Sequence, residues 1–295
     1  MSARLDDARA ALAAIAAREA ADPAIAPGSR TWWHLGESVA PRAVVLMHGF
    51  TNAPSQYALL GRELAQRGDA LIVPRFPYHG YADRMSEAIA ALRAADWQRT
   101  ALEAVTIAAR CGERVIVLGI SVAGTLAAWL ATHVAVDHAI AIAPFCGIRE
   151  LPGRANDAFG AALRALPNRF LWWDPRAKVN QPPPHGYPRF STHALGNSLQ
   201  LTGQIANDAA APHARRLTVV QNRSEPIVNN AYAWRRLAVA RACGVDVARV
   251  WISLHDTHDV IEPEIPQASP ATIYPVLLDL IAADVRVEGT SLAGG

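Results

Sequence analysis

Ser121 has the clearest potential for chemistry, because it closely follows an apolar run that ends in a glycine. The run 114–118 leads into Gly119, and Ala123 stands two residues beyond the serine. A serine between a strand and a helix, with small residues two positions to either side, is typical of a nucleophile elbow, a tight bend that exposes the hydroxyl. An ordinary helix N-cap is the alternative, so the serine's partners must decide between the two.

A serine hydroxyl attacks a carbonyl only when a base takes its proton and an acid orients that base. In the elbow arrangement the acid comes next along the chain and the histidine comes last. Glu225 lies in the turn after the apolar run 217–221, and His258 follows the run 247–252. This order predicts a catalytic triad of Ser121, Glu225 and His258.

Three other side chains of the last loop could replace members of this triad. His255 lies three residues before His258 and could serve as the base. Asp256 or Asp259 could serve as the acid in place of Glu225. Asp259 directly follows His258, and a residue seldom reaches the ring of its own neighbour well. His258 lies deeper past the end of the strand than His255 does. We therefore expect His258 and Glu225 to fill the two roles.

The elements that must position these residues alternate between strands and helices. Near-continuous apolar runs are typical of strands buried in a parallel sheet. Strands are predicted over 31–35, 43–47, 70–74, 114–118, 138–143, 217–221 and 247–252. Helices are predicted over 2–21, 55–67, 95–110, 125–131, 229–242 and 270–283. The alternation predicts an α/β fold with a mostly parallel, doubly wound sheet.

One long stretch interrupts this alternation. Residues 146–215 are rich in proline, tryptophan and arginine. A structureless loop of this length is uncommon in a compact domain, so we expect a cap built from short helices and turns. The predicted organisation is an N-terminal helix over 1–28, a core formed by 29–145 and 216–287, the cap over 146–215, and a flexible tail over 288–295.

Composition excludes several classes of protein. The 295 residues are 51% hydrophobic and 18% charged, which gives enough apolar material for a core and argues against a disordered chain. The formal net charge is only +2, and no basic block is present, so nucleic acid is not an expected partner. Cys111, Cys146 and Cys243 are far apart and form no C-x-x-C motif, so neither a disulfide framework nor a metal site is predicted.

The N-terminal stretch carries charges throughout its predicted helix and does not resemble a signal peptide. No stretch approaches about 18 uncharged apolar residues, so no membrane span is expected. These features favour a cytoplasmic location.

Four short motifs stand at the ends of the predicted strands. They are His48-Gly49-Phe50, Gly119-Ile120-Ser121-Val122-Ala123, Glu225-Pro226-Ile227-Val228 and Asp256-Thr257-His258-Asp259. Together they resemble those of α/β-hydrolases, in particular the esterase and monoacylglycerol-lipase-like group. The resemblance covers roughly residues 43–283 outside the cap, and it implies an α/β-hydrolase fold.

The resemblance also implies an oxyanion hole formed by the backbone N–H groups of Phe50 and Val122. Such a donor is worth about 3 kcal/mol in the transition state. His48 then has a structural role in holding the turn, and the alternative is that it acts as a second base. The family more often has Asp at the position of Glu225 and Gly at that of Ala123. Neither departure removes the mechanism, because Glu can orient an imidazole and Ala is small.

The implied activity is that of a cofactor-free serine hydrolase, a carboxylesterase that works through an acyl-enzyme. Its expected partner is a small-molecule ester with an apolar acyl or aryl group. Tyr78 and His79, on a loop at the same sheet edge, could contact substrate, and so could Trp172 and Trp173 of the cap. Each of these four could equally be structural, in a turn or in a core.

Other activities fit the same residues. Amide or peptide hydrolysis, acyl transfer and carbon–carbon cleavage can all use this triad. A binding protein on a hydrolase scaffold, with negligible turnover, is an alternative of a different class. No recognisable motif indicates the length of the acyl chain that the protein accepts, and none indicates its oligomeric state.

Overall fold

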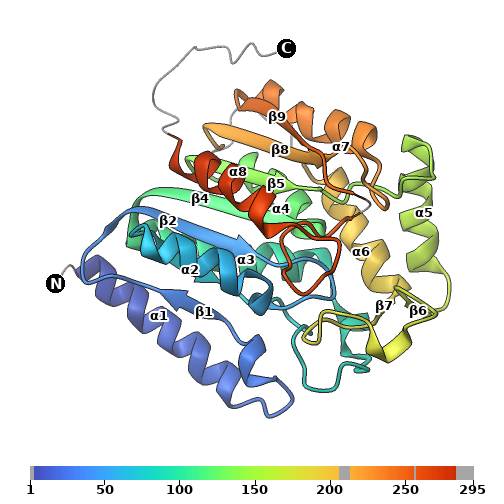
Figure 1. Ribbon diagram of the computed structural model, residues 1–295, viewed down its shortest axis with the longest axis horizontal. Helices are drawn as coiled ribbons and strands as arrows, with labels where there is room; N and C mark the ends of the chain where they lie inside the picture. Colours follow the sequence, from blue (N-terminus) through green and yellow to red (C-terminus); the bar gives the residue numbers. More distant parts are fainter. Residues whose placement is uncertain (1–2, 206–212, 256, 284–295) are drawn as a thin grey trace.

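A seven-stranded sheet forms the centre of the computed structural model, which describes residues 3–205, 213–255 and 257–283. The strand order is β1-β3-β2-β4-β5-β8-β9. All neighbours pair in parallel except β1, which runs antiparallel to β3 at the edge (Figure 1). The predicted mostly parallel, doubly wound α/β sheet is confirmed. The tail 288–295 and Asp256 lie outside the described residues.

Each predicted strand and helix has a counterpart. The strands of the main sheet are β1 Trp32–His34, β2 Ala40–Met47, β3 Ala70–Val73, β4 Gly112–Ile120, β5 His138–Ile142, β8 Arg216–Asn222 and β9 Asp246–Ile252. The helices outside the insertion are α1 Ala3–Ala20, α2 Ala58–Gln66, α3 Ala94–Cys111, α4 Val122–Ala131, α7 Asn230–Leu237 and α8 Pro270–Ala282.

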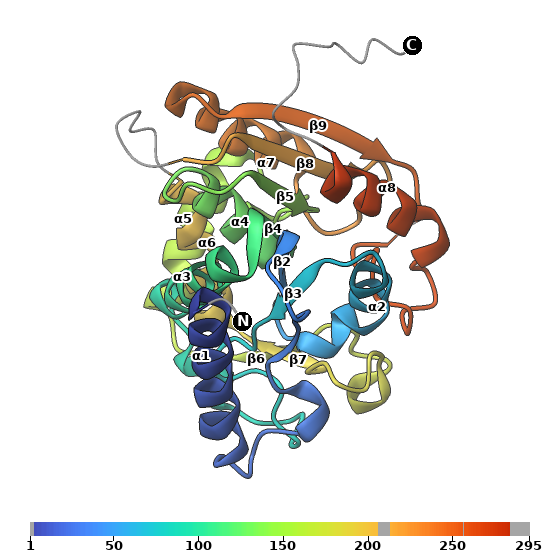
Figure 2. The same cartoon turned by 90° about the vertical axis from the view of Figure 1, so that its left-hand side faces the viewer.

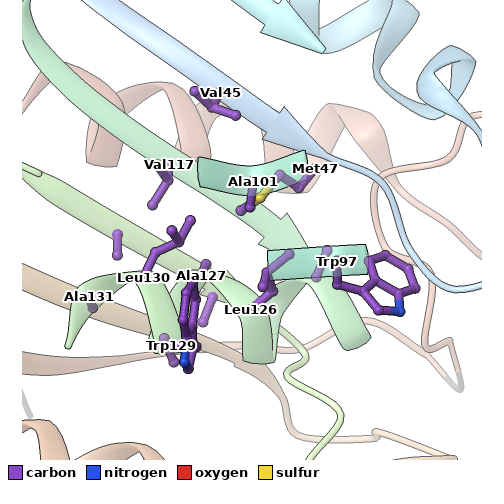
Figure 3. Packing of buried hydrophobic residues seen from close by; sticks show 14 of the residues in the cluster. Val45, Met47, Trp97, Ala101, Val117, Leu126, Ala127, Trp129, Leu130 and Ala131 are labelled. Atoms are coloured by element: carbon purple, nitrogen blue, oxygen red, sulfur yellow. The ribbon is translucent and has the colours of Figure 1, made fainter. Parts of the chain in front are cut away.

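Helices cover both faces of the sheet because neighbouring residues of each central strand point to opposite sides. Val45 and Met47 of β2 pack in one cluster with α1, α3 and α4. Val44 and Leu46 pack in the other cluster, with α2 and α8. Figure 2 shows α2 and α8 on the side of the sheet opposite α1, α3 and α4. Figure 3 shows the α3 and α4 side, where Trp97 lies near Met47.

An insertion of 146–215 separates β5 from β8. Its described part contains α5 Gly153–Ala165, the hairpin strands β6 Phe170–Trp172 and β7 Arg189–Ser191, and α6 Thr192–Gly203. This insertion lies toward the end of the sheet at which the parallel strands finish (Figure 1). Loops at that end form the ligand-binding crevice in open α/β sheets.

Candidate active site

Ser121 stands on a strained bend between β4 and α4. Its torsions are φ 59° and ψ −121°, a region that a residue with a side chain seldom adopts. The bend leaves no room beside Gly119, where a Cβ atom would lie 2.1 Å from the carbonyl oxygen of Ala123. The serine side chain makes no capping hydrogen bond to α4. The hydroxyl is therefore free to bond elsewhere.

That hydroxyl is hydrogen bonded to His258, which is in turn hydrogen bonded to Glu225. Oγ of Ser121 lies 2.9 Å from Nε2 of His258, and Nδ1 of His258 lies 2.9 Å from Oε1 of Glu225. A carboxylate can only accept, so Nδ1 carries the proton and donates it. Nε2 is thereby left to accept the proton of the serine hydroxyl, as a general base must.

Glu225 lies in the turn after β8 and is only 3% exposed. Its Oε1 also accepts hydrogen bonds from the backbone N–H groups of Ile227, at 2.9 Å, and Val228, at 3.2 Å. Burial opposes ionisation of Glu225, but the adjacent His258 and these two N–H groups outweigh burial and lower the pKa of Glu225. The carboxylate is therefore held ionised in a fixed orientation.

The pKa of His258 is shifted in the opposite direction, again in favour of the charged form. Burial lowers its pKa, but the charge and hydrogen bond of Glu225, together with the charge of Asp259, outweigh burial. The net effect raises the pKa of His258 above its ordinary value of 6.5. A base with a raised pKa accepts the serine proton more readily once it is itself neutral.

The structure separates the rival residues of the last loop. The side chain of His255 is exposed. Asp259 accepts a hydrogen bond at 2.7 Å from Nε2 of Gln56, and not from His258. Burial and the neighbouring Glu262 raise the pKa of Asp259 to about 6. Neither His255 nor Asp259, the two alternatives that the structure describes, takes part in the hydrogen bonds that join Ser121, His258 and Glu225.

Two residues that line the same cavity as Ser121 have backbone N–H groups available to bind an oxyanion. Val122 is the first residue of α4, where the N–H has no acceptor within the helix. Phe50 follows β2, and within the described chain its N–H has no hydrogen-bond acceptor. Phe50, Ser121, Val122 and His258 all line one cavity.

His48 is fully buried beneath this turn, as the structural role expected for it requires. Its Nδ1–H donates to the carbonyl oxygen of Gly49 at 3.0 Å, and its Nε2 accepts from the N–H of Phe76 at 3.2 Å. Burial and the neighbouring His79 hold the pKa of His48 well below 6.5. Because both ring nitrogens are engaged and the ring stays neutral, His48 steadies the turn.

The cavity has a volume of about 680 Å³ and a mainly apolar lining. From the insertion it receives Trp173, Tyr187 and Leu195, and from the core Ile120 and Phe145. A site of this size and character suits a small, largely apolar ligand.

Of the four side chains predicted as possible substrate contacts, Trp173 lines this cavity. Tyr78 instead lines a separate cavity of about 250 Å³ beside α1 and α3. His79 is fully buried, with Nδ1–H donating to the carbonyl oxygen of Pro77. Trp172 belongs to the hairpin strand β6 and is not part of the cavity lining.

The sequence did not indicate the polar residues that hold the turn after β2. Gln56, 1% exposed, accepts from the N–H of Gly49 at 2.9 Å and donates to Asp259. The carbonyl oxygen of Thr51 accepts from the N–H of Tyr187 at 2.7 Å. The contacts from Gln56 to Asp259 and from Tyr187 to Thr51 join residues more than about 100 positions apart, and no local pattern marks them. The one available signal was a glutamine among apolar residues near the start of α2.

The part of the chain that the structure describes has no site suited to metal binding or to catalysis by a thiol. No group of three or more His, Cys, Asp or Glu side chains there could hold a metal ion. Cys111, Cys146 and Cys243 are buried, and none of the three forms a disulfide. Burial raises the pKa of Cys111 and of Cys146 to about 11, so both are poor nucleophiles. Within 3–205, 213–255 and 257–283, no helix is long and apolar enough to cross a membrane.

The chain is similar to known proteins in sequence pattern and in fold. A family model described as the alpha/beta hydrolase family matches residues 44–289, which include every residue of the site. Among curated protein sequences, no match to the chain is found.

Several solved structures share the fold. The structure reported for the metagenome-derived lipolytic enzymes LipS and LipT has a TM-score of 0.66 and 19% identity, over 87% of this chain and 98% of that one. A monoacylglycerol lipase from Paleococcus ferrophilus has a TM-score of 0.60 and 15% identity, over 85% and 98%. A soluble variant of the monoglyceride lipase from Saccharomyces cerevisiae has a TM-score of 0.58 and 13% identity, over 85% and 88%. At these identities the similarity demonstrates the shared fold.

Proposed function

Because the chain belongs to the alpha/beta hydrolase family, we propose that it is a serine hydrolase that cleaves carboxylic esters through an acyl-enzyme. The observation that carries this proposal is the unbroken hydrogen-bond chain from Ser121 through His258 to Glu225, with 2.9 Å at each step. Ser121 and His258 line a mainly apolar cavity. Three lipolytic proteins among the structural neighbours agree with this assignment.

In the first half of the proposed reaction, Oγ of Ser121 attacks the ester carbonyl while Nε2 of His258 takes the hydroxyl proton. The carboxylate of Glu225 stabilises the imidazolium through Nδ1–H. The carbonyl oxygen becomes an oxyanion that accepts hydrogen bonds from the N–H groups of Phe50 and Val122. Collapse expels the alcohol, which receives its proton from His258.

In the second half, water enters beside His258 and attacks the acyl group on Ser121. His258 takes the proton of the water and then returns it to Oγ as the acid leaves. Every proton transfer thus passes through one imidazole, which is why its orientation by Glu225 matters. No cofactor is needed for either half.

We assign residues 146–215 as a cap that shapes the substrate cavity. The cavity is lined by Trp173, Gln181, Tyr187 and Leu195 of this segment together with Ile120 and Val122 of the core. The mainly apolar lining favours a small ester with an apolar acyl or aryl group.

The direct test is Ser121→Ala assayed with p-nitrophenyl esters. Removal of the nucleophile should lower kcat by at least about 10³-fold, as the loss of such a serine does elsewhere. Circular dichroism and the melting temperature check that the variant folds. A variant as active as the parent would refute the proposal.

A companion measurement separates an activated nucleophile from a passive pocket. A fluorophosphonate probe should label the parent at Ser121 and fail to label Ser121→Ala, because labelling requires an activated hydroxyl. A parent that resists labelling would indicate a ligand-binding protein. Esters, anilides and alcohol acyl acceptors, assayed side by side, then identify the bond that is cleaved.

A further inference from the structure

The turn that carries Phe50 contains a second strained residue. Thr51 has φ 63°, in the left-handed region that β-branched residues avoid, and it is only 6% exposed. Such a conformation persists only where surrounding contacts impose it.

The hydroxyl and the carbonyl group of Thr51 are both hydrogen bonded. Two of their three partners come from the insertion. The indole Nε1–H of Trp173 donates to Oγ1 of Thr51 at 2.9 Å. The backbone N–H of Tyr187 donates to the carbonyl oxygen of Thr51 at 2.7 Å. Oγ1 of Thr51 in turn donates to the carbonyl oxygen of Phe50 at 2.6 Å. The insertion therefore reaches the peptide groups of the turn through Thr51.

These bonds bear on the direction of the Phe50 N–H. The carbonyl of Gly49 shares a peptide plane with that N–H, and it accepts from the N–H of Asn52 at 3.1 Å and from His48 at 3.0 Å. With the carbonyls of Gly49, Phe50 and Thr51 all accepting bonds within the protein, the turn can rotate little. The Phe50 N–H is left without an acceptor in the described chain.

Trp173 is also packed against the turn by its ring. Its centroid lies 6.2 Å from that of Phe50 with the rings at 86°, and 4.3 Å from that of Phe190. The backbone N–H of Trp173 donates to the carbonyl oxygen of Pro188 at 3.1 Å. The indole is thus held at the place where it meets Oγ1 of Thr51, although the residue is 40% exposed.

We propose that Trp173, through its indole hydrogen bond to Thr51, is a positioning residue for the oxyanion hole. The inference rests on the proposed esterase activity, because it assigns the Phe50 N–H to the oxyanion. It makes the insertion part of the catalytic machinery as well as a wall of the cavity. A donor misplaced by a fraction of an ångström loses transition-state stabilisation while ground-state binding is little affected.

The experiment compares Thr51→Val, Trp173→Phe and the double variant with p-nitrophenyl esters. Both single variants remove the bond from the Trp173 indole to Thr51, and Thr51→Val also removes the bond from Oγ1 to the Phe50 carbonyl. Trp173→Phe should therefore lower kcat about tenfold, and Thr51→Val at least as much, with little change in the KM of a short acyl ester. The double variant should be no slower than Thr51→Val, because a bond can be lost only once. The low-pH limb of kcat should stay in place, since neither change touches His258 or Glu225.

Two further variants control the comparison. Thr51→Ser keeps the hydroxyl and should restore most of the kcat lost in Thr51→Val. Trp251→Phe makes the same change at a tryptophan of similar exposure, 39%, on β9 outside the cavity, and should leave kcat within about twofold. The melting temperatures of all variants separate loss of the fold from loss of catalysis.

Three results would overturn the inference. One is a folded Thr51→Val with parental kcat, another is a pair of losses that multiply in the double variant, and the third is a change in KM alone. Each of these can occur while Ser121→Ala is inactive. Failure of the proposed function, an active Ser121→Ala, is therefore recognised separately.

Discussion

At the scale of single residues, the charge of Glu225 sets the proton affinity of His258. The raised pKa of His258 implies that turnover falls as the pH drops through a value above 6.5, because the protonated ring cannot act as a base. Glu225→Gln removes the charge, so the inflection should move to lower pH, and the plateau of kcat should fall by about two to four orders of magnitude. The measurement is kcat/KM from about pH 5 to 9.

The exposed neighbour provides the matched control for this prediction. His255→Gln should leave both the plateau and the inflection where the parent has them, since His255 is exposed and does not contact Ser121. An inflection that stays fixed in Glu225→Gln, or one that moves in His255→Gln, would show that Glu225 does not govern the base.

The order of Ser121, Glu225 and His258 along the chain, together with the motifs around them, was the basis on which the triad was predicted. Their order is a property of the sequence, and each follows an apolar run whose end is visible. The catalytic roles themselves stay a prediction. Thr51 and Gln56 were not predicted, because their partners come from the insertion and from the last loop. Such pairings become visible only once the chain is folded.

At the scale of elements, the buried strands were predictable because a strand with helices on both faces is apolar along its length. β4 extends from Gly112 to Ile120, beyond the predicted 114–118, because Gly112 and Gly119 pair with β2 and Ile120 pairs with β5, whatever their own side chains. The hairpin of β6 and β7 was not predicted as strands. Its strands have three residues each and pair across a long connection, so neither carries a periodic signal.

The N-terminal helix, whose role the sequence left open, is attached to the core by a buried carboxylate. Glu19 of α1 is 4% exposed and accepts from the N–H of Thr31 at 2.7 Å and its hydroxyl at 2.8 Å. Its Oε1 also pairs with Arg75 at 3.3 Å. Leu5, Leu12 and their apolar neighbours place the same helix in the core cluster that contains α3.

Glu19→Ala should therefore destabilise the protein without changing its chemistry. Removing one partner of a buried pair costs about 3 kcal/mol, which corresponds to a fall in melting temperature of about 5–10 °C. Ester turnover at 25 °C should be unchanged, because Glu19 lies outside the active-site cavity.

An exposed ion pair between the same helix and α3 is the control. Arg18 and Glu103 approach to 3.9 Å, with both side chains largely in solvent. Glu103→Ala should cost less than about 1 kcal/mol. Equal melting temperatures for the Glu19 and Glu103 variants would contradict a stabilising role for the buried carboxylate.

At the scale of the whole molecule, the sheet and its two helical layers form the fold expected from the sequence, and the family match agrees with it. The boundaries of the cap and of the tail stay predictions. The cavity could not be predicted, because its lining combines β4, the turn after β2, the last loop and the insertion. Their spacing depends on how the layers pack, which no single stretch of sequence determines.

The fold as a whole also buries histidines that must stay neutral. His48 and His79 lie beneath the turn after β2, and His138 lies at the start of β5. Burial is the largest cause in each case; it lowers the pKa of His79 and of His138 to about 4 and that of His48 well below 6.5. Between pH 6.5 and 4 the unfolded chain binds protons that the native histidines do not. Their contribution to stability, complete above pH 6.5, is therefore lost as the pH falls.

His138→Gln isolates one part of this acid sensitivity. In the parent, the free energy of unfolding includes about 3 kcal/mol from His138 that disappears between pH 6.5 and 4. Asp259, whose pKa is raised to about 6, changes stability with the opposite sign over part of this range, so the difference between parent and variant is the quantity to measure. Urea unfolding at several pH values should show a shallower pH dependence for the variant. Identical pH dependence in both proteins would mean that His138 is protonated in the native state, and the buried hydrogen bond of 2.8 Å between its Nε2 and Oγ1 of Thr218 would then have to be donated by the ring.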